Sequence, residues 1–384
     1  MDIFILSEDD YINRIKKKEP AMNINRTLSS RYYLDREIYE QEKIKILYRN
    51  WHYAGHSSQV ANIGDYLTLK IGDENLIVIR ADDGELKGFF NVCRHRAHKL
   101  LEDEGNVGSI TCPYHGWNYS IDGELRYAKN ADKMTGFNKS EFCLASFQVT
   151  DMCNFIFVNL DKNAPTLYHQ ADGFVKDLQK RFPFIDKLRP LPDDKSRPST
   201  INANWKIVID NYLECYHCTK AHPAFVDMVD MNHYQTEIYN IWSRQYAPRS
   251  KPDNKAYNFD KNAAIQDMCF WFLWPSTALG YVPGVEALFF SSIRPDSIDK
   301  TTRFGHWLVT DDTILPNGFN NYINDVLFSE DISLCESVHQ GLRSQSYNNG
   351  PIMIDPKHSG TSEIAVQHFH DLVHQALGDE DEDI

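Results

Sequence analysis

Short strand-like runs and longer helical periods divide the chain into two differently patterned regions. From Trp51 to Leu160, β-branched and aromatic residues recur in short runs such as 66–71 and 75–80. Turn residues separate these runs, which predicts a small all-β domain. Beyond it, helical spacing mixes with strand-like runs at Ala287–Ile293 and Thr302–Val309. This mixture predicts a larger α+β domain.

Helical periodicity also marks both ends of the chain. The polar N-terminal segment has helical patterns around Glu8–Lys18 and Asp35–Leu47. Residues Asn321–Ser344 repeat apolar positions at the spacing of one long amphipathic helix. The five consecutive acids Asp379–Asp383 predict a solvated tail.

The patterns predict four parts along the chain. Residues 1–45 form a helical segment that packs on the larger domain, and residues 46–160 form the all-β domain. Residues 161–378 form the larger α+β domain, and residues 379–384 are the acidic tail. We therefore expect an all-β domain inserted into a larger domain built from both chain ends.

Composition narrows the range of functions. The chain has 384 residues and a net charge of −14, which argues against a general nucleic-acid binder. No apolar run approaches the roughly 20 residues that cross a bilayer, and acids follow the short apolar start too closely for a signal peptide. We expect a cytoplasmic protein without a membrane partner, whose eight cysteines are reduced and available as metal ligands.

Two Cys/His pairs lie within the all-β region. Cys93-x-His95 and Cys112-x-x-His115 occur in N-V-C-R-H-R-A-H and T-C-P-Y-H-G-W. Zinc would bind all four residues in a tetrahedron, although zinc sites often have two cysteines close together in sequence and two histidines close together in sequence. A Rieske [2Fe–2S] cluster needs two thiolates on one iron and two imidazoles on the other. Because each pair supplies one sulfur and one nitrogen, the spacing favours the cluster and leaves zinc as the alternative.

A second set of metal-ligating residues follows Asn204. Glu214 and His217 are three residues apart and would share a helix face. His222 is five residues further, too far around a regular helix, but Pro223 biases it away from helical geometry. A helix that ends before His222 would let both imidazoles meet. Two histidines and one carboxylate are the ligands of non-heme Fe(II) centres that activate O2.

Two questions remain open on pattern alone. The carboxylate ligand could be Glu330, Asp331 or Glu336. The Cys215-x-x-Cys218 pair could be a redox or metal-binding thiol pair, but buried cysteines are commonly small core residues. We expect these two thiols to be core residues that form no disulfide.

Together these motifs resemble the alpha subunits of Rieske non-heme iron oxygenases. The likeness includes C-R-H-R-A, C-P-Y-H-G-W, an acid followed by H-x-x-x-x-H, and E-D-x-x-L, and it spans about Ser30 to Val373. The form E-C-Y-H-C and the W-P-S-T stretch at Trp274 resemble a subgroup that acts on quaternary ammonium compounds such as carnitine and betaines. The resemblance implies an α+β chain with an all-β Rieske domain. The catalytic domain would be helix-grip-like, with an antiparallel sheet and flanking helices.

The resemblance also assigns roles to individual residues. It places the [2Fe–2S] cluster on the two Cys/His pairs, namely Cys93, His95, Cys112 and His115. It places the mononuclear Fe(II) on His217, His222 and Asp331. Glu214 would link His217 to a cluster histidine, His115, of the neighbouring subunit of a homotrimer. Most members have aspartate at this position, so the glutamate is a departure.

The implied activity is that of the terminal oxygenase component of a two-component monooxygenase. A separate NAD(P)H-dependent reductase would supply electrons, because the chain has no G-x-G-x-x-G loop. With O2, the enzyme would hydroxylate a quaternary amine, followed by C–N cleavage or N-demethylation. Aromatic faces attract such cations, and Trp271, Trp274 and Tyr281 are the candidate substrate-binding residues. An aromatic-ring hydroxylating oxygenase and a Rieske electron-transfer protein remain the alternatives.

Overall fold

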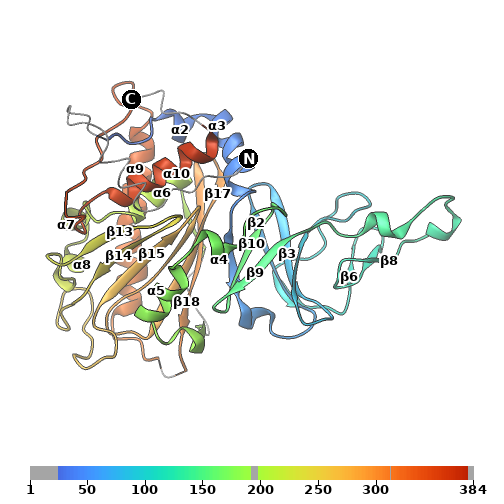
Figure 1. Ribbon diagram of the computed structural model, residues 1–384, viewed down its shortest axis with the longest axis horizontal. Helices are drawn as coiled ribbons and strands as arrows, with labels where there is room; N and C mark the ends of the chain where they lie inside the picture. The colour runs from blue at the N-terminus through green and yellow to red at the C-terminus, as the bar shows by residue number, and fades with distance from the viewer. Residues whose placement is uncertain (1–24, 192–197, 312, 379–384) are drawn as a thin grey trace. The chain divides into compact units, whose positions relative to one another are not determined.

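The computed structural model describes residues 25–191, 198–311 and 313–378. The expected helix at Glu8–Lys18 and the acidic tail lie outside these residues. The chain divides into two compact units (Figure 1). One unit is Leu47–Leu167, and the other combines the described residues up to Ile46 with those from Tyr168 onward. The first unit is thus inserted between two segments of the second.

The Leu47–Leu167 unit is built from two antiparallel sheets. The larger has the order β1-β10-β9-β4-β3-β2-β5, and the smaller has the order β6-β7-β8. The strands are β1 (His52–His56), β2 (Asp65–Ile71), β3 (Glu74–Arg80), β4 (Leu86–Phe90), β5 (Glu104–Asn106), β6 (Ile110–Thr111), β7 (Asn118–Tyr119), β8 (Leu125–Tyr127), β9 (Ser146–Met152) and β10 (Phe155–Asn159). The strands predicted at 66–71 and 75–80 are confirmed as β2 and β3.

Both faces of the larger sheet are covered in this unit. Along β3, Leu76 and Val78 pack into one apolar cluster, whereas Ile77 and Ile79 pack into another. A strand that is buried on both faces needs a continuous apolar run rather than an alternating one. The second cluster also contains Cys93 and Cys112, so the cysteine-bearing loops rest on a packed core.

The other unit contains one eight-stranded antiparallel sheet. Its order is β11-β18-β17-β16-β15-β14-β13, and β12 also pairs with β18. The strands are β11 (Arg189–Pro190), β12 (Ser199–Ile201), β13 (Gln235–Ile238), β14 (Trp242–Ala247), β15 (Met268–Leu273), β16 (Thr277–Tyr281), β17 (Ala287–Ser297) and β18 (Lys300–Val309). The strands predicted at 287–293 and 302–309 are confirmed as parts of the long hairpin β17–β18.

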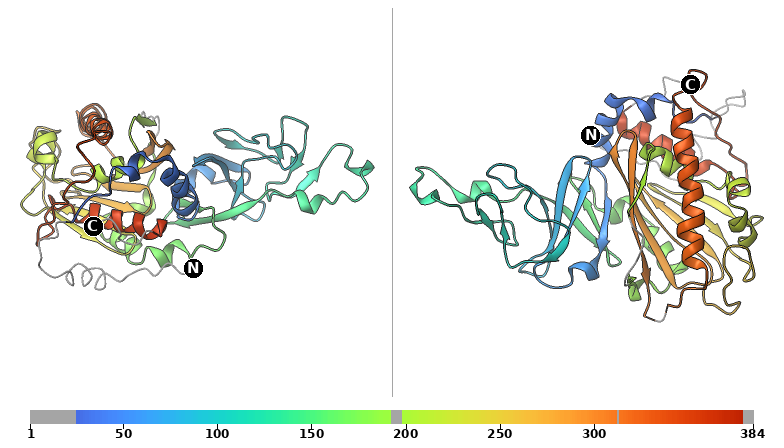
Figure 2. Two further views of the ribbon diagram at one scale, coloured as in Figure 1. Left: turned by 90° about the horizontal axis from the view of Figure 1, so that it is seen from above. Right: turned by 180° about the vertical axis from the view of Figure 1, so that it is seen from behind.

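Helices cover both faces of this sheet (Figure 2). α6 and α9 lie on one face, and α5 lies on the other. The helices are α2 (Arg31–Leu34), α3 (Arg36–Glu42), α4 (Leu167–Gln170), α5 (Phe174–Arg181), α6 (Trp205–Tyr212), α7 (Cys218–Ala221), α8 (Pro223–Met228), α9 (Phe328–Gly341) and α10 (Ile364–Leu377). The predicted long helix consists of a π-helical stretch, Asn321–Leu327, that continues into α9. Within the described residues, no helix is long and apolar enough to cross a membrane.

The N-terminal helices belong to the same unit as this sheet. The Glu42 carboxylate of α3 accepts hydrogen bonds from Trp205 Nε1 at 2.9 Å and from Lys206 Nζ at 2.5 Å. The Glu42 and Lys206 side chains are both fully buried. This charged contact attaches α3 to the first turn of α6, the helix that leads to the predicted metal ligands.

Candidate metal centres

Two loops of the Leu47–Leu167 unit bring the four predicted cluster residues together. Cys93 and His95 follow β4, and Cys112 and His115 lie between β6 and β7. Both sulfurs are buried, with Cys93 3% and Cys112 2% exposed, whereas both imidazoles are exposed. The centroids of the two imidazole rings are 4.7 Å apart. Each loop therefore places its cysteine sulfur in the core of the unit and its imidazole at the surface.

The two loops share one backbone conformation. The N–H of Ala97 donates to the Cys93 carbonyl at 3.0 Å, and the N–H of Gly116 donates to the Cys112 carbonyl at 3.0 Å. Ala97 and Gly116 both adopt left-handed geometry, with φ of 55° and 70°. Glycine adopts that conformation without strain, whereas alanine does so at a cost.

These residues fit a [2Fe–2S] cluster with two thiolates on its inner iron and two imidazoles on its outer iron. Burial raises the pKa of the Cys112 thiol, so a thiolate here needs a bound metal to stabilise it. Sequence reasoning missed two supporting rings. The Tyr119 hydroxyl lies 3.3 Å from Cys93 Sγ, and Trp117 stacks on His95 with centroids 4.8 Å apart.

In the other unit, helix α6 ends before the second set of ligands. The prediction that Glu214 and His217 share a helix face is wrong, because α6 stops at Tyr212 and α7 begins at Cys218. The Glu214 carboxylate accepts hydrogen bonds from the backbone N–H groups of Tyr216 and His217. Such local side-chain bonds compete with helix continuation. The predicted contact still forms, since Glu214 Oε1 lies 2.5 Å from His217 Nδ1.

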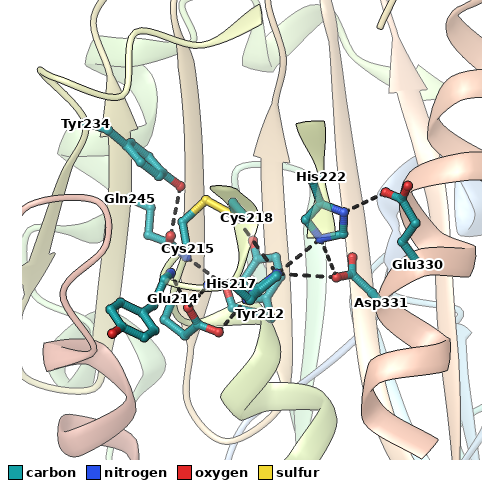
Figure 3. Close-up of a disulfide and its surroundings, with 11 residues drawn as sticks. Tyr212, Glu214, Cys215, His217, Cys218, His222, Tyr234, Gln245, Glu330 and Asp331 are labelled. Carbon is teal, nitrogen blue, oxygen red and sulfur yellow. Dashed lines mark hydrogen bonds and ion pairs between the residues drawn. A yellow bond between two sulfur atoms is a disulfide. The ribbon is translucent and has the colours of Figure 1, made fainter. Parts of the chain in front are cut away.

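Two imidazoles and one carboxylate meet beside this break (Figure 3). His222 has φ −121° and ψ 63°, so it leaves helical geometry before Pro223 as predicted. His217 Nε2 lies 3.1 Å from His222 Nε2. Asp331 Oδ1, in the first turn of α9, lies 2.9 Å from His222 Nε2 and 3.6 Å from His217 Nε2. One ligand atom from each residue lies within 4.8 Å of the others.

The other two candidate acids occupy different positions. Glu330 Oε2 lies 2.7 Å from His222 Nδ1, whereas Asp331 contacts the other ring nitrogen, Nε2 (Figure 3). Glu336 instead accepts hydrogen bonds from Asn202 at 3.0 and 2.8 Å. Asp331 is therefore the acid that the structure brings to both Nε2 atoms.

Each histidine of the centre has its own carboxylate partner. Glu214 contacts Nδ1 of His217, and Glu330 contacts Nδ1 of His222. A carboxylate on Nδ1 fixes the tautomer and leaves Nε2 available to a metal. Sequence reasoning did not assign this role to Glu330. In the sequence, only its position next to Asp331 indicates that Glu330 could lie near the metal centre.

The electrostatics of these residues suit a cation. Burial lowers the pKa of His217, but hydrogen bonds to Asp331 and Glu214 outweigh it and raise the pKa to about 9. Burial raises the pKa of Asp331, but hydrogen bonds to the two histidines outweigh it and lower the pKa. Metal ligands must be deprotonated, so a metal ion would replace protons at this site. Two imidazoles and one carboxylate on one side of an ion are the donor set of non-heme Fe(II).

A cavity of about 140 Å³ adjoins the three ligands and is mostly apolar. A dry cavity of about 150 Å³ can hold a benzene-sized molecule. Phe270, Phe289 and Trp307 form an aromatic row on its sheet wall, with successive ring centroids 5.7 Å apart. Gly280 separates Phe270 from Phe289, and a Cβ there would lie 2.3 Å from the Phe270 ring. The glycine therefore allows the two rings to approach.

Trp271, Trp274 and Tyr281, the aromatics expected at the substrate, do not line this cavity. Side chains alternate along a strand, so Trp271 faces away from the cavity and donates to Asp177 of α5 at 2.8 Å. Tyr281 is fully buried beside Trp271, and Trp274 packs against Phe369 of α10. All three are core residues, and Phe270, Phe289 and Trp307 take the place expected of them.

The structure also corrects the expectation for the cysteine pair. Cys215 and Cys218 form a disulfide rather than two core thiols (Figure 3). Their Cα atoms are 4.9 Å apart, within the range of about 4.4–6.8 Å that a disulfide spans. The bridge closes the short segment that contains His217, next to Glu214.

Comparison with known proteins matches both units to families. Residues 50–147 match the Rieske [2Fe-2S] domain, and residues 187–379 match the ring hydroxylating alpha subunit catalytic domain. The carnitine monooxygenase oxygenase subunit of Escherichia coli (strain K12) is 34% identical over 92% of this chain and 94% of its own length. The chloroplastic choline monooxygenase of Atriplex hortensis is 29% identical over 91% of this chain and 78% of its own length.

Solved structures show the same likeness. The quaternary ammonium Rieske monooxygenase CntA in complex with L-carnitine superposes with a TM-score of 0.81 at 32% identity. The match covers 92% of this chain and 96% of that chain. CntA in complex with γ-butyrobetaine gives the same values.

Proposed function

The chain belongs to the Rieske non-heme iron oxygenases, with a [2Fe–2S] domain and a mononuclear-iron domain, and we propose that it is the oxygenase component of a quaternary ammonium monooxygenase. The expected α+β organisation, with an antiparallel catalytic sheet and flanking helices, is confirmed. The observation that supports the proposed activity best is the meeting of His217, His222 and Asp331 at the edge of an apolar, aromatic cavity.

We assign the cluster to the two cysteine–histidine loops and the mononuclear iron to the three residues at the cavity. When bound, the iron supplies O2 activation with electrons from the cluster. His217 and His222 would hold the iron through Nε2 and Asp331 through a carboxylate oxygen. Glu214 and Glu330 would keep the two rings oriented. The apolar walls would exclude water from the substrate.

Glu214 would also form the link to the cluster of a neighbouring subunit in a homotrimer. Its side chain keeps 11% exposure, and Tyr216 beside it is 52% exposed, so another chain can reach the carboxylate. One CntA structure is described in terms of inter-subunit electron transfer. In this arrangement His115 of one subunit would donate a hydrogen bond to Glu214 of the next. A separate NAD(P)H-dependent reductase would supply the electrons.

The substrate would be a carnitine-like or betaine-like quaternary amine. The aromatic row formed by Phe270, Phe289 and Trp307 can attract its ammonium group, by about 0.5–2 kcal/mol per ring contact. Carnitine and choline monooxygenase subunits are among the relatives, and CntA has been solved with carnitine and γ-butyrobetaine. Hydroxylation of a carbon attached to nitrogen would lead to C–N cleavage or N-demethylation.

A substrate screen tests this proposal. Reductase-coupled O2 uptake should rise with L-carnitine, γ-butyrobetaine, glycine betaine or choline, and product analysis should show the cleaved amine. Turnover of an arene without turnover of any quaternary amine would instead support an aromatic-ring hydroxylating oxygenase. A cytoplasmic location completes the proposal.

Counting iron separates an oxygenase from an electron-transfer protein. The oxygenase should hold about three irons per chain, two in the cluster and one mononuclear. His217→Ala should remove one iron and all oxygenation but keep the spectrum of the cluster. Oxygenation that survives this change would contradict the assignment of the three ligands.

A further inference from the structure

Arg303 is a charged residue on the wall of the mostly apolar cavity. It lies on β18 opposite Ile293 and faces the cavity together with Trp307. Its guanidinium lies 3.6 Å from the centroid of the Phe328 ring. Among the described residues the guanidinium of Arg303 forms no hydrogen bond or ion pair, although its backbone pairs within the sheet. By contrast, the guanidinium of Arg244 forms ion pairs with Asp177 and Glu237.

An unpaired guanidinium in an apolar cavity is costly. Burial lowers the pKa of Arg303 to about 10, which still leaves it protonated at neutral pH. Arg303 is half-buried. A charge that is partly removed from water without a partner destabilises the fold, and partners normally offset that cost. The negative charge of Asp331 attracts the guanidinium electrostatically and partly offsets the lowering of the Arg303 pKa. In the assigned centre, however, the Asp331 carboxylate would bind the iron. Arg303 therefore remains available to a ligand.

The geometry around Arg303 favours an anion with two acceptor oxygens. The Phe328 ring lies against the guanidinium, and the N–H groups of the guanidinium have no hydrogen-bond partner among the described residues. A planar carboxylate matches those edges with two parallel hydrogen bonds. Ser291 also lines the cavity and is a diagonal neighbour of Arg303 across the β17–β18 pair. Its opposite residue is Gly305, where a Cβ would lie 2.4 Å from the Ser291 hydroxyl, so a side chain there would fill this space.

We propose that Arg303 binds a carboxylate of the substrate, with Ser291 as a second donor, and that the enzyme selects quaternary amines with an anionic end. This inference rests on the proposed function and defines its substrate class. Trp307, in the aromatic row, is four residues along β18 from Arg303, or about 13 Å of strand. The ammonium would lie toward the aromatic row, since the charge of Arg303 repels it from the other end. A neutral-ended amine such as choline would leave Arg303 unpaired.

Binding calorimetry on the iron-loaded, full-length protein tests the proposal without turnover. The ligands are γ-butyrobetaine, L-carnitine and glycine betaine, each compared with its primary amide, which keeps the ammonium and removes the negative charge. Arg303→Gln should weaken binding of the carboxylates by about 10- to 150-fold, the value of a charge-assisted hydrogen bond. It should not weaken binding of the amides, because they have no negative charge to lose a partner and their ammonium is repelled by Arg303. The KM for a carboxylated substrate should rise by a similar factor.

Arg294→Gln is the matched control. Arg294 lies on the adjacent strand of the same hairpin, and its guanidinium carbon lies 4.9 Å from the centroid of the Phe304 ring. Its Nε donates to the Ser292 hydroxyl, and it does not line the cavity. Its replacement should change neither class of ligand. Circular dichroism and iron content should verify the fold of each variant. If Arg303→Gln does not fold, Arg303→Lys replaces it and should still weaken the carboxylates more than the amides.

Three results would overturn the proposal. Equal losses for carboxylates and amides would mean that Arg303 acts through the structure or through Asp331. Unchanged binding of both the carboxylates and the amides by Arg303→Gln would mean that Arg303 has no role in substrate recognition. Binding of neither class by the unaltered protein would refute the proposed function itself, which separates that failure from a failure of Arg303 alone.

Discussion

Removing the charge of Glu214 and of Glu330 one at a time should weaken iron binding unequally. Glu214 accepts three hydrogen bonds, through Oε1 from His217 Nδ1 and through Oε2 from the backbone N–H groups of Tyr216 and His217. Glu330 has one contact in this centre, at 2.7 Å from His222 Nδ1. Both act on a histidine through Nδ1, so Glu214→Gln and Glu330→Gln form a matched pair.

The structure sets the expected difference between these variants. A glutamine has one acceptor oxygen and one N–H2 group. At 330 its oxygen can still face His222, so only the charge is lost, and we expect about tenfold weaker Fe(II) binding. At 214 the N–H2 group must face either His217 or the two backbone N–H groups. That mismatch costs about 1–3 kcal/mol, which is a further factor of at least about 5 in affinity.

Anaerobic competition with a coloured Fe(II) chelator would measure both affinities. Visible circular dichroism of the cluster would verify that the other unit is intact, and far-ultraviolet circular dichroism would verify the fold. The reasoning is refuted if Glu330→Gln weakens binding as much as Glu214→Gln. It is also refuted if neither variant differs from the unaltered protein.

Three further predictions concern stability. Lys206→Met removes the ion-pair partner of the buried Glu42, which keeps only its hydrogen bond from Trp205, and should lower the free energy of unfolding by about 3–5 kcal/mol. A second change, Glu42→Gln, should recover part of that loss in urea titrations. Burial lowers the pKa of His368 in the folded protein, so as the pH falls this histidine is protonated in the unfolded chain before it is protonated in the folded one. The free energy of unfolding should therefore fall as the pH drops below about 6.5, by up to about 1.4 kcal/mol per pH unit until the pKa of His368 in the folded protein is reached. His368→Gln should flatten this slope in urea titrations between about pH 7 and 5.5. Replacing Cys215 and Cys218 together by serine should lower the free energy of unfolding by no more than about 2 kcal/mol, because the disulfide closes a loop of only four residues. A larger loss, measured by denaturant titration, would mean that the bridge also fixes the backbone between α6 and α7.

Residues close in sequence were the predictable part of both centres. Each Cys/His pair lies within one short loop, so its spacing already indicates which atoms can meet. His222 precedes a proline, and the local restriction on its backbone predicts that it leaves the helix. Asp331 is 109 residues from His222, and no local rule connects them. Only the resemblance to a family selected Asp331 over its neighbours.

The cavity wall could not be predicted because it depends on strand register. Phe270 and Trp271 are adjacent in sequence and equally aromatic, yet one lines the cavity and the other packs on α5. A shift of one residue exchanges the two faces of a strand. The pairing of Phe289 with Trp307 requires knowledge of the β17–β18 register. The unpaired state of Arg303 depends on its three-dimensional surroundings and has no sequence signal.

The break between α6 and α7 shows why a correct contact can accompany a wrong secondary structure. Spacing of three residues predicted that Glu214 meets His217, and a helix is one way to place them side by side. In the structure the carboxylate accepts from backbone N–H groups that follow it, which ends the helix, and its other oxygen still reaches the imidazole. One side chain therefore sets both the local backbone and the orientation of a metal ligand. A substitution at 214 should disturb the iron site through both effects, whereas one at 330 acts on the imidazole alone.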